Sequence, residues 1–273
     1  MPSRIGTFVG AAIGAALLAY GVRAVGARSI SVAQRQLRIP NNPDELRRRA
    51  LQLGAIFLKR PGDLRFIPAW IASLRSDDTP LSARVIWLPY AARSFIEKRI
   101  DGQTDAFEYG AGGSTLWLSR RVRSLTTVEH HPDWYEMVKQ ALQDEGSGNC
   151  VLLLCEPQLH EALKGAAADG SITYHSDECE GSFEQYARAI DHLPDRSLDL
   201  VIVDGRSRAA CLVHATPKVR PGGLLVLDDS DRERYRTAKE SLRDWPSEEF
   251  CGLRPYSLKL NCTTVWTRPL EPS

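Results

Sequence analysis

The segment from Ala106 to Thr115, A-F-E-Y-G-A-G-G-S-T, constrains the fold most strongly, because it predicts a strand, a tight turn and a helix N-terminus in succession. An acid, Glu108, lies within the apolar strand, and the turn contains Gly110, Gly112 and Gly113. Glycine tolerates positive φ and lets a ligand approach the backbone closely. The N-terminus of the helix favours a polar or anionic ligand group. By itself this pattern predicts a Rossmann-like unit and leaves its ligand open.

An uncharged run from Ile5 to Val22 precedes the rest of the chain. As a helix its 18 residues would span about 27 Å, close to the roughly 30 Å hydrocarbon core of a bilayer. Gly6, Gly10 and Gly14 repeat at every fourth position, which would let two membrane helices pack closely as a homodimer. Arginines flank the run and are more numerous after it, so we expect a single-pass anchor with the following chain on the cytoplasmic face of the membrane. A cleaved signal peptide or an interfacial helix is the alternative.

Charge and cysteine content limit the partners and the compartment. Residues 1–60 carry ten Lys and Arg against two Asp and Glu, whereas the whole chain has a net charge of +1. The body is therefore neutral to acidic and lacks the basic face of a nucleic-acid-binding protein, so we expect no nucleic-acid partner. The six cysteines show no CxxC pair and no disulfide framework, which favours free thiols and a reducing compartment.

Three regions are expected along the chain: an anchor at 1–28, a basic connector and helical extension at 29–104, and an α/β domain at 105–270. From Asp105 onward strands and helices alternate, which predicts a doubly wound, mostly parallel, seven-stranded Rossmann-like sheet. Residues 156–183 break the alternation and are expected to form an insertion or lid. The predicted helices include Val85–Ile100, Ala209–Val219 and Arg232–Trp245, with a turn at Pro221-Gly222-Gly223.

Polar residues follow the ends of the predicted strands, where open α/β sheets bind ligands. Glu129 lies 17 residues beyond Gly112, a suitable distance for an acid that binds ribose hydroxyls. In a G-x-G-x-x-G alignment from Gly110, Thr115 replaces the third glycine, so the dinucleotide fingerprint is incomplete. Glu108 would repel a pyrophosphate and attract a cationic aminoacid tail. These details favour S-adenosylmethionine over a nicotinamide dinucleotide.

Four motifs occur in order: E-Y-G-A-G from Glu108, V-E-H from Val128, V-D-G-R from Val203, and P-G-G-L-L-V-L-D-D-S from Pro221. This order resembles the class I S-adenosylmethionine-dependent methyltransferases, in particular uncharacterised bacterial members, over roughly Asp105 to Thr267. The resemblance implies transfer of a methyl group to an unidentified acceptor. We expect an oxygen acceptor, because an acid can serve as its base. A non-catalytic, membrane-tethered interaction protein and a nicotinamide-dependent oxidoreductase are the alternatives.

The resemblance also implies roles for single residues. Asp204 would lie near the methionine amine and the transferring methyl group, as the catalytic residue. The implied cofactor-binding residues are Glu108 for the aminoacid tail, Gly110 and Gly112 for close approach, Ser114 and Thr115 as donors, Glu129 for the ribose, and His130 beside the adenine.

A metal site is a further hypothesis. Catechol-type O-methyltransferases hold a divalent cation with acids at similar positions, which implies Mg²⁺ bound by Asp204, Asp228 and Asp229. Asp229 stands where that family has Asn, and the alternative is that Asp228 and Asp229 cap a turn or face solvent. The ligand-rich stretch 175–180 matches no zinc spacing and is expected to be a solvated lid. Arg206 and Arg208 either contact an acidic group of the substrate or lie on the surface.

Overall fold

The computed structural model describes residues 43–159 and 173–270. The predicted anchor and its glycine stripe lie outside the described residues, as does the middle of the predicted insertion. Within the described ranges no helix is both long enough and apolar enough to cross a membrane. Membrane attachment through residues 5–22 therefore stays a prediction.

One seven-stranded sheet forms the centre of the fold, in the order β3-β2-β1-β4-β5-β7-β6, and confirms the predicted architecture. The first five strands are parallel, and β7 runs antiparallel to both of its neighbours. The strands are β1 (Asp105–Tyr109), β2 (Ser124–Glu129), β3 (Cys150–Leu154), β4 (Leu198–Val203), β5 (Val219–Asp228), β6 (Ser247–Gly252) and β7 (Asn261–Thr267). The strand order reverses between β1 and β4, and open α/β sheets bind ligands at such a switch point.

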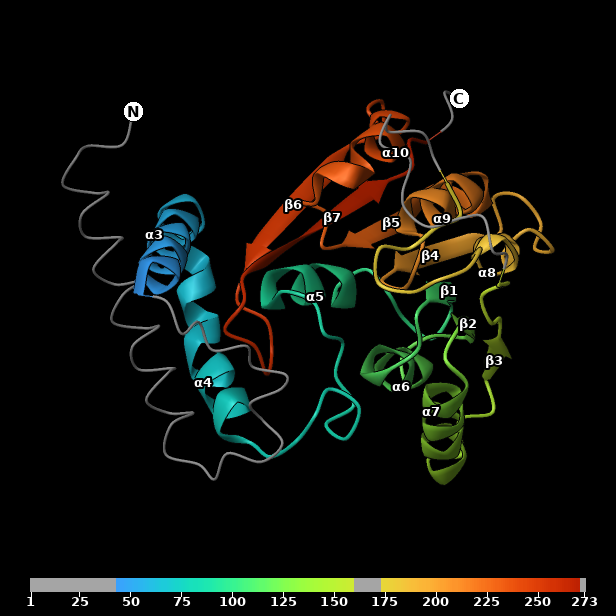
Figure 1. The fold of residues 1–273 in the computed structure, drawn as a ribbon, viewed down its shortest axis with the longest axis horizontal. Helices are drawn as coiled ribbons and strands as arrows, with labels where there is room; N and C mark the ends of the chain where they lie inside the picture. Colours follow the sequence, from blue (N-terminus) through green and yellow to red (C-terminus); the bar gives the residue numbers. More distant parts are fainter. Residues whose placement is uncertain (1–42, 160–172, 271–273) are drawn as a thin grey trace.

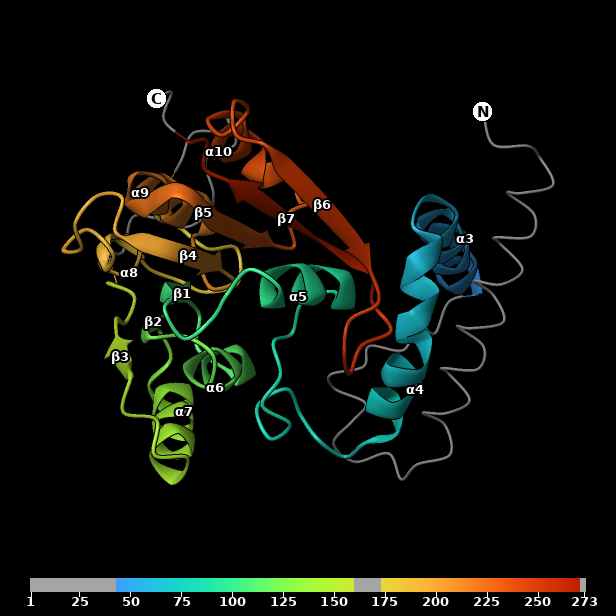
Figure 2. The ribbon, with the colours of Figure 1, turned by 180° about the vertical axis from the view of Figure 1, so that it is seen from behind.

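Helices cover both faces of the sheet (Figures 1 and 2). One face packs against α5 (Tyr90–Glu97) and α6 (Gly113–Ser119), with α7 (Pro132–Asp144) beside them, and the other against α8 (Glu184–Arg188), α9 (Arg208–Ala215) and α10 (Arg236–Glu240). Successive side chains of a strand point to opposite faces. In β4 the residues Leu200 and Ile202 therefore join one core, and Val201 and Val203 join the other. Burial on both faces explains the continuous apolar strands.

The helical extension that the sequence predicts is α3 (Pro43–Lys59), the 3₁₀ helix η1 (Pro61–Phe66) and α4 (Ile67–Arg75). It has a separate core in which Leu53 and Trp70 pack against Leu253 and Leu258 from the connection between β6 and β7. The indole Nε1 of Trp70 also donates to the carbonyl of Ser257 at 2.8 Å. Figure 1 shows α3 and α4 beside this end of the β6–β7 pair, away from α7 and β3.

Several predicted element boundaries are wrong. The helix expected over Val85–Ile100 begins only at Tyr90, because the preceding residues form an irregular segment that buries Ile86 and Leu88 against the sheet. Pro221-Gly222-Gly223 is part of β5 rather than a turn, since the backbones of Gly222 and Gly223 pair with Arg268. The helix expected over Arg232–Trp245 is reduced to η3 (Glu233–Tyr235) and α10.

The prediction of free thiols is wrong for two cysteines. Cys251 in β6 lies directly opposite Cys262 in β7, and the two form a disulfide. Only 11 residues separate them in sequence, but the antiparallel register that aligns them is set by the pairing of the two strands. The other cysteines in the described ranges, Cys150, Cys155, Cys179 and Cys211, are free.

Candidate active site

The glycine turn follows β1 at the switch point, and its glycines have different structural roles. Gly110 has φ +93°, and a Cβ there would lie 2.8 Å from the carbonyl oxygen of Asp204. A Cβ at Gly113 would lie 2.0 Å from the carbonyl oxygen of Pro80. Both positions therefore require glycine for conformation or packing. A Cβ at Gly112 would meet no atom within 4 Å, so the turn is open at this residue and can accept a ligand against its backbone.

Glu108 lies beneath the glycine turn and is fully buried. Its Oε2 accepts hydrogen bonds from Thr115 Oγ1 at 2.6 Å and Thr127 Oγ1 at 3.0 Å, and Thr115 Oγ1 in turn accepts from Gly112 N at 2.9 Å. Burial raises the pKa of Glu108 to about 7, although the hydrogen bonds from the two threonines oppose the shift. Thr115 thus holds the turn, and a direct bond from its hydroxyl to a ligand would require it to leave Glu108.

The second carboxylate at the turn is Glu129, at the end of β2. Its Oε2 accepts from Ala111 N at 3.0 Å, and its Oε1 accepts from the backbone N–H groups of His130 and His131, each at 2.8 Å. Burial opposes ionisation, but the hydrogen bonds from His130 and His131 outweigh it and lower the pKa of Glu129. Trp134 Nε1 donates to Ala111 O at 2.7 Å, so both polar groups of this peptide are fixed. Glu129 therefore presents an ionised carboxylate beside the turn.

His130 lies between the ends of β2 and β4. Its ring packs against Phe183 and Tyr186, with centroid distances of 5.6 and 6.2 Å, and Arg206 Nε lies 3.4 Å from its Nε2. A flat aromatic surface next to an ionised carboxylate suits the adenine and ribose of a nucleoside. The fully buried hydroxyl of Tyr186 has no hydrogen-bond partner among the described residues.

Three acids follow β4 and β5, but they surround an arginine. Arg208 is buried, and its NH2 lies 3.0 Å from Asp204 Oδ1, while its NH1 lies 3.9 Å from Asp228 Oδ2 and 3.8 Å from Asp229 Oδ2. Its NH1 also donates to the carbonyl of Asp228 at 2.6 Å. Burial and repulsion from Asp228 raise the pKa of Asp204, although Arg208 opposes the shift. For Asp229 burial is outweighed by Arg208 and Arg232, which lower its pKa.

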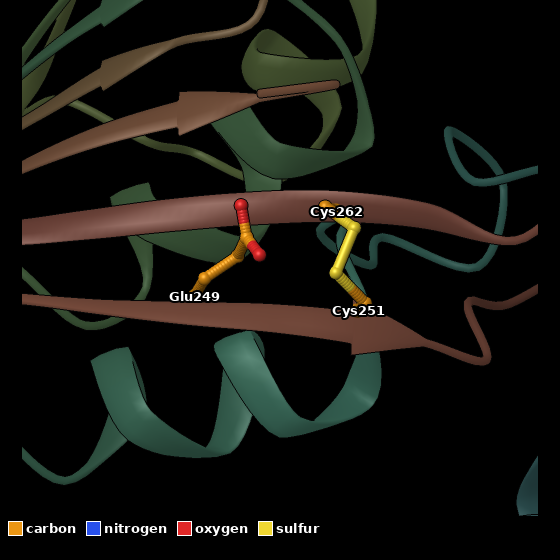
Figure 3. Close-up of side chains that lie close together, drawn as sticks. All are labelled: Glu249, Cys251 and Cys262. Atoms are coloured by element: carbon orange, nitrogen blue, oxygen red, sulfur yellow. A yellow bond between two sulfur atoms is a disulfide. The ribbon is translucent and has the colours of Figure 1, made fainter. Parts of the chain in front are cut away.

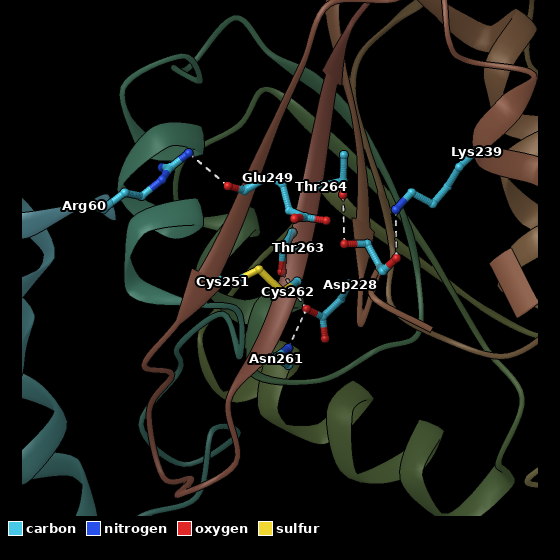
Figure 4. The surroundings of a disulfide bond; sticks show 10 residues. Arg60, Asp228, Lys239, Glu249, Cys251, Asn261, Cys262, Thr263 and Thr264 are labelled. Carbon is cyan, nitrogen blue, oxygen red and sulfur yellow. Dashed lines mark hydrogen bonds between the residues drawn. A yellow bond between two sulfur atoms is a disulfide. The ribbon is translucent and has the colours of Figure 1, made fainter. Parts of the chain in front are cut away.

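The environment of Asp228 does not fit the predicted Mg²⁺ site. Its Oδ1 accepts from Asn261 Nδ2 at 2.9 Å and from Thr263 Oγ1 at 2.6 Å, both from β7 (Figure 4). Asp204 and Asp229 each form an ion pair with an arginine, Arg208 and Arg232 respectively. A divalent cation would therefore have to displace the Arg208 guanidinium from the centre of the three acids. These acids bind a protein cation and do not fit the predicted Mg²⁺ site.

Figure 3 shows a different group, Glu249 and Cys251 of β6 with Cys262 of β7. In the part of the chain that the structure describes, this is the only set of three acidic, histidine or cysteine side chains whose ligand atoms lie within 4.8 Å of one another. The two sulfurs are bonded to each other. Metal binding needs thiolates, so the oxidised pair offers no metal site.

A cavity opens beside the three acids, over the ends of β4 and β5. It has about 600 Å³ of empty volume, including space open to solvent, and four arginines line it: Arg206, Arg208, Arg232 and Arg234. Asp177 and Glu178, from the end of the predicted lid, also line it. The sequence singled out Arg206 and Arg208, but it gave no signal for Arg232 and Arg234, which were expected to lie on a long helix.

His214 has a structural position, with Nδ1 2.8 Å from Asp191 Oδ1 and Nε2 3.1 Å from the hydroxyl of Tyr174. In the described stretch 175–180, no residue belongs to a metal-like ligand set, and Asp177 and Glu178 pair with the arginines of the cavity.

A comparison with known sequences relates part of the chain to a family. Residues 107–230, which run from β1 to just beyond β5, match the family model of a methyltransferase domain. This match confirms the predicted resemblance to methyltransferases, and the sheet order is the one that the resemblance implies. A search of curated proteins found no match.

Solved structures similar to this methyltransferase domain are distant in sequence. An rRNA methylase from Streptococcus thermophilus is 13% identical, over 67% of this chain and 96% of that chain, with a TM-score of 0.46. A methyltransferase from Geobacter sulfurreducens is 14% identical, over 75% and 96%, with a TM-score of 0.46. An S-adenosylmethionine-dependent O-methyltransferase from Thermotoga maritima is 12% identical, over 68% of each chain, with a TM-score of 0.44. None of these similarities bears on the acceptor.

Proposed function

We propose that this methyltransferase domain transfers a methyl group from S-adenosylmethionine to an oxygen atom of a small acceptor. One observation carries the proposal: the Glu129 carboxylate lies 3.0 Å from Ala111 N, in the glycine turn that is open at Gly112. An ionised acid for ribose hydroxyls and an accessible backbone for the methionine portion therefore lie side by side at the switch point. The His130 ring beside Glu129 supplies the surface for the base.

The cofactor would supply a methyl group on a sulfonium, which is electrophilic without further activation. Protein groups then have to position the acceptor and remove its proton. Asp204 follows β4, and its backbone N–H donates to the carbonyl of Tyr109 at 3.0 Å, which places it next to the glycine turn. Burial raises its pKa, so its carboxylate has an increased affinity for the proton that an acceptor hydroxyl loses. Arg208, 3.0 Å away, fixes the orientation of that carboxylate.

Glu108 would complete the cofactor site from below. Its Oε1 is buried and has no hydrogen-bond partner in the described part of the chain. A cationic amine above the turn would give this carboxylate a counter-charge and favour its ionised form. The buried Glu108 carboxylate therefore has the charge that complements the cationic amine of the aminoacid tail.

Calorimetric titration of the full-length protein with S-adenosylmethionine and with S-adenosylhomocysteine tests the proposal. We expect both to bind, and Glu129→Gln to weaken both, because an amide replaces the charged acceptor of the ribose hydroxyls. NAD serves as the control ligand, since the incomplete fingerprint predicts no binding. If neither S-adenosylmethionine nor S-adenosylhomocysteine binds, the methyltransferase proposal is wrong. Binding of NAD alone would favour an oxidoreductase.

A further inference from the structure

The cavity over β4 and β5 has a chemical character that methyl transfer alone does not require. Its wall combines Arg206, after β4, with Arg232 and Arg234, after β5. The three side chains are 26 to 30% exposed, so they are accessible from the cavity without being free in solvent. Arginine presents a planar set of donors that matches the oxygens of a carboxylate or phosphate.

Carboxylates of the protein itself already bind these arginines. Glu178 forms ion pairs with Arg206, with Arg232 at 3.2 Å and with Arg234 at 3.9 Å, and Asp177 pairs with Arg234. The two acids are 44 to 45% exposed and therefore lie nearer the mouth than the arginines do. Burial is outweighed by Arg206 and Arg232, which lower the pKa of Glu178.

The arginines differ in how much other negative charge they have. Arg232 also pairs with Asp229, and Arg208 is surrounded by the three acids after β4 and β5. For Arg206 and Arg234, Asp177 and Glu178 are the only acids within ion-pair distance among the residues that the structure describes. If Asp177 and Glu178 moved away, Arg206 and Arg234 would lack a counter-charge beside the cavity.

We propose that the acceptor of this enzyme is a small molecule with an anionic oxyacid group, a carboxylate or a phosphate, which binds Arg206, Arg232 and Arg234 in place of Asp177 and Glu178. The inference rests on the proposed function, because it identifies the cavity as the acceptor site. Arg206 supports this assignment, since its Nε lies 3.4 Å from the His130 ring assigned to the cofactor. An anion held by Arg206 would lie next to the cofactor site.

In this arrangement Asp177 and Glu178 compete with the acceptor. Exposed ion pairs contribute only about 0.2–1 kcal/mol each, so an incoming anion with better geometry can displace them. Replacing one of these two acids should then raise the affinity for the anion, whereas replacing one of the arginines that bind the anion should lower it. A variant that merely unfolds cannot bind more tightly.

The test is calorimetric titration of the full-length protein with succinate and with inorganic phosphate, and succinamide serves as the uncharged control. We expect at least one anion to bind and succinamide not to bind. Arg234→Gln should lower the affinity for that anion about tenfold, because a charge-assisted hydrogen bond contributes about 1.5–3 kcal/mol. Glu178→Gln should raise the affinity about threefold, because the anion no longer has to displace exposed ion pairs between this side chain and three arginines.

Arg236→Gln is the matched control, since Arg236 follows Tyr235 in the same segment but is 78% exposed and pairs with Glu233 away from the cavity. It should leave the affinity unchanged. The inference is overturned if neither anion binds to the wild type or to Glu178→Gln, or if Arg234→Gln and Arg236→Gln bind equally well. Succinate binding without phosphate binding identifies a carboxylate acceptor, and the reverse identifies a phosphate.

The S-adenosylmethionine titration is independent of this result. Anion binding with the expected variant pattern, but without cofactor binding, would leave an anion site and remove the methyltransferase proposal. Cofactor binding without anion binding would retain the methyltransferase and overturn the anionic acceptor.

Discussion

Replacement of Glu108 by Gln isolates the effect of one buried carboxyl group on stability. Burial raises the pKa of Glu108 from 4.5 to about 7 in the folded protein. The folded state therefore holds this proton more tightly than the unfolded state does. Its contribution to stability is fully present below about pH 4.5 and is lost as the pH rises through about 7. A shift of about 2.5 units corresponds to about 3 kcal/mol.

Glu108→Gln removes this titration. The free energy of unfolding of the variant, relative to wild type, should rise by about 3 kcal/mol between pH 4.5 and pH 8. The difference in free energy of unfolding also contains a contribution that does not change with pH. The glutamine amide would replace Oε1, which has no hydrogen-bond partner, and an unsatisfied buried donor costs about 1–3 kcal/mol. The change with pH is therefore the informative quantity.

Urea denaturation of the full-length protein at several pH values measures this difference. Glu136→Gln is the control, because Glu136 is 64% exposed on α7 and should give a curve parallel to wild type. Parallel curves for Glu108→Gln and wild type would contradict the prediction, since they would show that Glu108 has the same pKa in the folded and unfolded states.

Three further substitutions test other parts of the structure. Gly110→Ala should destabilise the protein by more than about 1 kcal/mol and abolish binding of S-adenosylhomocysteine. The reason is that φ of Gly110 is +93° and the added Cβ would lie 2.8 Å from the carbonyl oxygen of Asp204. Retained affinity for S-adenosylhomocysteine in calorimetry would contradict this prediction. Arg208→Met should cost about 3–5 kcal/mol in urea denaturation, since it leaves three acids without their central cation, and a smaller loss at pH 5 than at pH 8 is expected. Cys251→Ser should cost about 3 kcal/mol through the loss of a short cross-link, and dithiothreitol should lower the melting temperature of wild type but not of the variant.

The sequence pattern around each strand end predicted three parts of the candidate site separately. The glycine turn from Gly110 to Gly113, Glu129 and Asp204 each follow an apolar strand. Since parallel strands end at the same edge of a sheet, these three parts are expected to lie at one edge. That rule does not determine where each side chain points. Thr115 was expected to face the ligand, but its hydroxyl is bound to Glu108 beneath the turn.

Charged side chains were harder to assign because their partners come from distant segments. Asp228 and Asp229 matched a metal pattern in the sequence, but Arg208, which lies 20 residues before Asp228, occupies the space between the acids. The arginines of the cavity follow two different strands, and the acids that neutralise them come from the end of the insertion. No spacing along the chain encodes such a group.

Sequence patterns predicted the sheet, the glycine turn and the resemblance to methyltransferases, because strand periodicity, glycine conformation and acids at strand ends are properties of short segments. Which charged groups pair with one another is visible only in the folded chain. The cross-strand register joins Cys251 to Cys262, Asn261 and Thr263 hold Asp228, and Arg208 lies among three acids. These contacts depend on how the strands and loops pack in three dimensions, and an ion pair or a disulfide forms only where that packing brings its two partners within reach.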